Sequence, residues 1–147
     1  MQQKLEQHGE LLQINRELSE FIQRPRPEPD ETGAREWAAA LYHQLVTLHE
    51  RLTRHFLGRE QGLLSELRSS YPRATHQLGQ MREEHGQLLT TLRGLIADAL
   101  CYAESTCPPD PHLRDRSRRL LDGISAHESS VTELVQELIL TDLGSGD

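Results

Sequence analysis

Aromatic residues and long apolar runs are both scarce in this chain of 147 residues. Phe, Tyr and Trp together make up 4% of it, which is little for a β-rich fold, since strands favour aromatic and β-branched side chains. No segment alternates apolar and polar residues as a half-buried strand does. The longest apolar-leaning run, residues 88–100, is too short to span a bilayer and contains Arg93 and Asp98. These absences exclude a β-sheet fold and give no support to a membrane role.

Positive charge and cysteine are also in short supply. The chain has 16 Lys and Arg against 23 Asp and Glu, a net charge of −7, so a nucleic-acid partner gets no electrostatic support. Cys101 and Cys107 are too few for a disulfide framework and lack the spacing of a zinc site, which predicts reduced thiols in a cytoplasmic protein. Neither a glycine-rich phosphate loop nor a glycine-flanked nucleophile is found, and we expect no enzyme.

Leucine-rich amphipathic segments fill the chain between three proline-containing breaks. The breaks lie at residues 25–29, 70–72 and 107–111. Apolar residues recurring at steps of three and four predict all-α structure, with helices over about residues 2–23, 35–69, 72–104 and 111–142. Long helices joined by short connections are typical of an up-down-up-down four-helix bundle, and the length suits one domain over residues 1–147.

Each predicted helix carries one histidine on its own leucine-rich face. Counting from the connections, at about 1.5 Å per residue, places the four histidines within roughly 7 Å of one level in an antiparallel bundle. Imidazole is the commonest protein ligand of first-row transition metals, and the cores of helix bundles hold such sites. The pattern predicts a metal site whose ligands are His8, His55, His85 and His127.

Short motifs on the four predicted helices resemble the hemerythrin-like, or HHE cation-binding, family over essentially the whole chain. In chain order they are Glu6-Gln7-His8, His55-Phe56 with Glu60 and Gly62, Glu83-Glu84-His85 with Leu88-Leu89, and His127-Glu128 with Asp142-Leu143-Gly144. The resemblance implies a left-handed four-helix bundle with a non-haem di-iron centre, held by histidines and bridging carboxylates. It also implies oxygen binding, sensing of oxygen, iron or nitric oxide, or handling of iron and peroxide.

The chain departs from the family pattern at both expected bridging acids. Arg59 stands one turn after His55, and Val131 stands one turn after His127. Two neighbouring iron ions repel each other, so the loss of these anionic ligands disfavours a di-iron centre, and Arg59 adds a fixed positive charge. A straight α-helix turns Glu60 about 140° away from His55, toward the boundary of the core, whereas a wide helical turn brings it inward.

Three functions remain open on these grounds. The sequence favours a non-enzymatic hemerythrin-like domain whose histidine-lined site is altered or vestigial and binds a metal ion weakly at most; a single iron, zinc or copper ion needs no bridging acid. The alternative is a functional di-iron protein that binds O2 or another small ligand, or senses oxygen or iron, through Glu60, Glu84 or Glu128. The third is a metal-free helical interaction module that forms a homodimer or docks a protein partner.

Overall fold

A computed structural model gives the arrangement of the chain. It describes residues 2–24, 31–108 and 110–145, without the side chains of residues 2–10, 31, 32, 59 and 142–145. The described residues form helices and no strand. The α-helices are α1 (Gln2–Gln23), α2 (Glu31–His55), α3 (Gln61–Ser70), α4 (Thr75–Ala103) and α5 (Leu113–Ser145). Two short turns complete the order: a π-helical turn η1 (Phe56–Glu60) between α2 and α3, and a 3-10 turn η2 (Pro72–Ala74) before α4.

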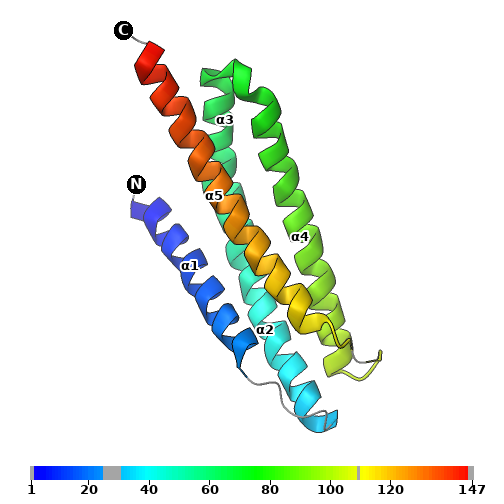
Figure 1. Cartoon of the computed structure of the whole chain (residues 1–147). Helices are drawn as coiled ribbons and strands as arrows, with labels where there is room; N and C mark the ends of the chain where they lie inside the picture. The colour runs from blue at the N-terminus through cyan, green and yellow to red at the C-terminus, as the bar shows by residue number, and fades with distance from the viewer. Residues whose placement is uncertain (1, 25–30, 109, 146–147) are drawn as a thin grey trace.

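The helices pack as an up-down-up-down bundle (Figure 1), as the sequence predicts. Contacts join α1 to α2, α2 to α4, α4 to α5 and α5 back to α1, which closes a four-membered ring, and α3 also packs against α4. The helix predicted over residues 35–69 begins earlier, at Glu31, and is interrupted by η1, which the periodicity did not predict. Over the described residues, no helix is long and apolar enough to cross a membrane.

The apolar core has two parts separated along the bundle axis. The larger part is built on the leucines that α2 buries at steps of three and four, and α1, α4 and α5 pack against them. The smaller part lies near the α3–α4 turn and comprises Leu64, Leu67, Ala74, Leu78, Leu134 and Leu138. In each of α4 and α5, one buried histidine lies in the sequence between the residues of these two parts. The buried polar residues described below therefore form a layer with apolar packing on both sides.

The end of α4 explains a wrong prediction about the cysteines. The helix ends at Ala103, and Ser105 adopts a positive φ of 60°, which reverses the chain direction. Cys107 is thereby brought back over Cys101, with a Cα–Cα distance of 5.6 Å, and the two form a disulfide instead of the predicted reduced thiols. The six-residue spacing gave no signal of this pairing, because the pairing depends on where the helix ends.

The neighbouring residues Leu45 and Val46 test the packing of the core. Leu45 is 0% exposed and Val46 is 39% exposed, one residue further round α2. We expect Leu45→Ala to lower the free energy of unfolding by about 2–5 kcal/mol, because it removes a buried side chain and leaves a cavity. Val46→Ala should change it by no more than about 0.5 kcal/mol. Urea unfolding followed by circular dichroism measures both; equal effects would contradict this packing.

Candidate metal centre

The π-helical turn η1 determines where Glu60 points. In this turn the backbone N–H of Gln61 donates a hydrogen bond to the carbonyl of Phe56, five residues back, where an α-helix would use four. The wider turn brings Glu60 round to the side of His55, and the Glu60 side chain is 3% exposed. The expectation from a straight helix, that Glu60 lies at the boundary of the core, is therefore wrong.

The carboxylate of Glu60 lies among three buried histidines from three different helices. Its Oε1 accepts a hydrogen bond from Nε2 of His127 at 2.6 Å and lies 2.7 Å from Nε2 of His85. Its Oε2 lies 4.0 Å from Nε2 of His55. The structure thus brings together three of the four predicted histidine ligands. The side chain of the fourth, His8, lies outside the described residues, as does the side chain of Arg59.

Two further acids reach histidines on other helices of the bundle. Glu84 in α4 accepts a hydrogen bond from Nδ1 of His127 in α5, at 2.5 Å. Glu128 in α5 lies 2.7 Å from Nε2 of His55 in α2. Each acid is next in sequence to a histidine of its own helix. It points about 100° away from that histidine around the helix axis, and so reaches a histidine on a different helix. The acids therefore link α2, α4 and α5 at one level.

Aromatic packing holds the imidazole rings in place. The ring of Phe56, the first residue of the π-helical turn, stacks on His85 with centroids 4.1 Å apart and an interplanar angle of 12°. Phe56 and His127 pack edge to face with ring centroids 5.6 Å apart, and the ring centroids of His85 and His127 lie 4.7 Å apart. Val131, which stands where the resemblance implies an acid, is buried and lines a cavity of about 310 Å³ beside His55 and Glu60.

The charges within the cluster stabilise one another. Burial on its own would raise the pKa of Glu60, but hydrogen bonds and charge interactions with His127 and His85 outweigh it and lower that pKa to about 2. Burial would lower the pKa of His127, whereas hydrogen bonds and charge interactions with Glu60 and Glu84 raise it above its ordinary value. Glu60 is therefore ionised at neutral pH, and His127 is biased toward the imidazolium form.

The cluster has the composition of a metal site with two positions. One group of potential ligands is Glu60, His85 and His127, and the other is His55, Glu60 and Glu128; within each, the ligand atoms lie within 4.8 Å of one another. Among the described residues, Oε2 of Glu60 is buried without a hydrogen bond. Buried polar atoms normally have partners, and nitrogen and oxygen donors of this kind suit iron and its neighbours. The residues fit a metal ion, and Glu60 is shared by both groups.

Sequence reasoning assigned Glu60 to the wrong face because it extended the His55 face through position 59 to Leu63. The buried residues beyond the turn are Leu64 and Leu67, which are 6% and 7% exposed. Counting back four residues from Leu64 gives Glu60. The register of these two leucines was therefore a signal in the sequence that could have placed Glu60 in the core.

Comparison with known proteins agrees with the fold and the cluster. A family model described as the hemerythrin HHE cation binding domain matches residues 5–138. The matched range contains every residue of the cluster. No curated protein and no solved structure matches the chain.

Stability of the metal-free chain should depend on pH in two limbs. Glu60 titrates at about 2 when folded and 4.5 ordinarily, so its contribution is present above pH 4.5 and is lost as the pH falls toward 2. The pKa of His127 is raised above 6.5, so its contribution is complete below pH 6.5 and is lost as the pH rises through the raised value. Urea unfolding in the presence of a chelator should show both limbs. Glu60→Gln should remove the acid limb and weaken the other, because Glu84 still pairs with His127. An unchanged pH profile in Glu60→Gln would contradict the pairing.

Deleting Gly58 tests whether the π-helical turn acts as a one-residue insertion in an α-helix. Without Gly58, Glu60 would follow His55 by four residues, and an ordinary α-helix would keep it on the same face. We expect the deletion to change the free energy of unfolding by no more than about 1 kcal/mol. Deleting the exposed Glu66 from α3 is the control, because it rotates the rest of that helix by about 100° and should cost about 2–5 kcal/mol through Leu67. Equal losses would show that η1 is not an insertion.

Proposed function

The chain belongs to the hemerythrin HHE cation-binding family, and we propose that it holds two metal ions, with iron preferred, on the two sides of Glu60. The observation that carries this proposal is the position of Glu60 in both groups of potential ligands. A carboxylate with one oxygen toward each group is suited to bridge two metal ions. The proposal favours the di-iron alternative over the vestigial site that the sequence alone favoured.

The ligands of the two positions follow from the contacts within the cluster. His85 and His127 would bind one ion, His55 and Glu128 the other, and Glu60 both. Glu84 would act through His127: by accepting a hydrogen bond from Nδ1–H it keeps the proton on Nδ1 and leaves Nε2 available to a metal. His8 stays a predicted further ligand, on sequence grounds.

Charge supports two ions more strongly than the sequence suggested. Repulsion between two cations a few ångströms apart falls when anionic ligands lie between and beside them. Glu60 supplies the shared anion, and Glu128 and Glu84 add negative charge on either side of it. These three acids replace the two that are missing at Arg59 and Val131.

A binding or sensing role suits this site better than catalysis. Iron held there would supply affinity for O2 or another small ligand, as the family resemblance implies. The residues of the chain hold the ligands at one level, orient His127 through Glu84, and keep bulk water from the buried faces of His55, Glu60 and His85. We propose a non-enzymatic domain that binds or senses a small ligand through iron.

The metal-free interaction module is the second candidate, and one observation favours it. Both ring nitrogens of His127 already have carboxylate partners, Glu60 and Glu84, and His55 pairs with Glu128. The cluster thus satisfies many of its own polar groups without a metal. Under this candidate the layer serves to align the helices, and the function lies on the surface.

Metal analysis of protein purified after iron supplementation separates the candidates. We expect about two iron ions per chain by mass spectrometry, and a loss of at least one in Glu60→Gln, because the amide keeps the size of the side chain but removes its charge. Glu66→Gln, at an exposed position in α3, is the matched control and should retain both. Iron-free wild-type protein would favour the interaction module.

Arg59→Glu adds a second arm to the same measurement. If Glu60 is the working bridge, this substitution should change the iron content little. Iron binding that appears only in Arg59→Glu would show that the natural site is vestigial.

A further inference from the structure

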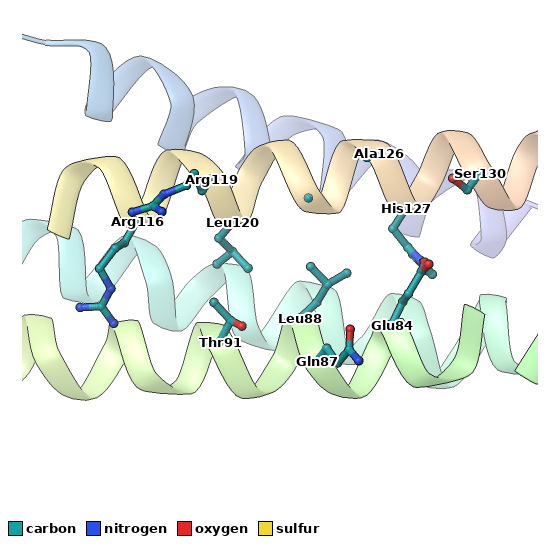
Figure 2. A pocket seen from close by; sticks show the side chains of 11 residues that line it. Glu84, Gln87, Leu88, Thr91, Arg116, Arg119, Leu120, Ala126, His127 and Ser130 are labelled. Carbon is teal, nitrogen blue, oxygen red and sulfur yellow. The ribbon is translucent and has the colours of Figure 1, made fainter. Parts of the chain in front are cut away.

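A groove of about 670 Å³ runs between α4 and α5 and reaches the metal centre (Figure 2). Glu84 and His127 line its inner end, and Arg116 and Arg119 line its outer end. Its volume lies in the range of sites that hold small organic molecules. The proposed metal function does not account for the part of this groove that lies beyond Glu84 and His127.

Small residues on α5 create the groove. Gly123, Ala126 and Ser130 recur at steps of three and four along the side that lines it. A Cβ atom at Gly123 would lie 3.4 Å from Cδ2 of Leu88 across the groove, so any longer side chain at position 123 would occupy the space. Leu88 and Leu120 give the middle of the groove an apolar surface.

Two arginines lie at the outer end of the groove, and they differ in whether an acid pairs with them. Arg116 is held by two carboxylates, Asp98 at 2.8 Å and Asp110 at 2.6 Å, so its single charge is more than matched. Arg119 is exposed and forms no ion pair with any residue in the described part of the chain. At the inner end the carboxylate of Glu84 is bound to His127. A ligand that complements this groove has its anionic group at Arg119 and none at the inner end.

The length of the groove limits the size of that ligand. Arg119 and His127 are eight residues apart on α5. At 1.5 Å per residue, their backbone positions are separated by about 12 Å along the helix axis. An extended chain advances about 1.2 Å per bond, so roughly ten bonds span this distance. A carboxylic acid with a chain of about ten carbon atoms has the matching length, charge and apolar body.

We propose that the α4–α5 groove binds a medium-chain monocarboxylic acid, with its carboxylate on Arg119 and its hydrocarbon chain over Leu120 and Leu88 toward His127. This site goes beyond the proposed metal function, and it requires no metal. Its occupation would cover the approach to His127 from the α4–α5 side. The net charge of −7 gives the protein as a whole no preference for anions, so any preference for the acid must come from the groove itself.

Titration of the metal-free full chain with submicellar decanoate, followed by amide chemical shifts in NMR, tests the proposal. We expect saturable shifts at Leu88, Gly123 and Ala126, and weaker shifts with decylamine, whose charge is reversed. Arg119→Gln should weaken decanoate binding several-fold, because it removes the charge that holds the carboxylate. Arg118→Gln is the matched control: it removes an exposed charge that does not line the groove, and it should bind as wild type does.

A second set of variants tests the proposal by filling the groove with larger side chains. Gly123→Leu should reduce decanoate binding at least tenfold, while Gly94→Leu, where nothing lies within 4 Å of a new Cβ, should not. Ala126→Leu, at an exposed lining position, serves the same purpose should Gly123→Leu fail to fold. Three results would overturn the proposal: no saturable shifts, tighter binding of decylamine than of decanoate, or binding unaffected by both the charge and the filling variants. Because the experiment uses metal-free protein, its failure leaves the metal proposal untouched.

Discussion

The carboxylate of Glu60 is the constraint on which the rest of the core depends. An ionised carboxylate buried among leucines is costly unless it is paired and hydrogen-bonded. Three histidines from α2, α4 and α5 supply the partners, and they must lie at one level to do so. The polar layer therefore fixes the axial register of these helices, which uniform leucine packing would leave weakly specified. The two apolar parts of the core can then pack without sliding past each other.

The acids around this layer connect it across the helices. Glu84 in α4 pairs with His127 on the adjacent α5, and Glu128 in α5 pairs with His55 on α2, diagonally across the bundle, so moving α5 would break contacts with two helices. Such cross-links hold ligand side chains in defined orientations, which a metal site requires. The two sides of the layer are nevertheless unequal. The His127 side opens into the long α4–α5 groove, while the His55 side borders a smaller cavity lined by Val131. The two proposed metal positions would therefore meet ligands of different size.

The sequence predicted the fold well because helix period, proline breaks and leucine content all pointed the same way. It also predicted the layer of His55, His85 and His127, because axial height in an antiparallel bundle depends only on residue counts, which tolerate small errors at helix ends. It failed where the outcome depended on local backbone geometry. Glu60 was misplaced because a straight helix was assumed through residues 56–60, and the cysteine pair was missed because the end of α4 was not known. One extra residue in a helical turn changes the direction in which the following side chains point by a large angle, whereas it changes their height along the helix axis only slightly.

That sensitivity explains why a set of metal ligands can look incomplete when judged by sequence spacing and yet be complete in the folded structure. With α-helical spacing, position 59 is the place for an acid beside His55, and arginine there suggests a lost site. With the π-helical turn, the fifth residue takes that place, and Glu60 meets the imidazoles of His55, His85 and His127. The turn persists because returning to a straight helix would expose Glu60 and leave His85 and His127 without their shared anion. The backbone irregularity and the buried acid thus depend on each other, and neither can be judged from the list of residues alone.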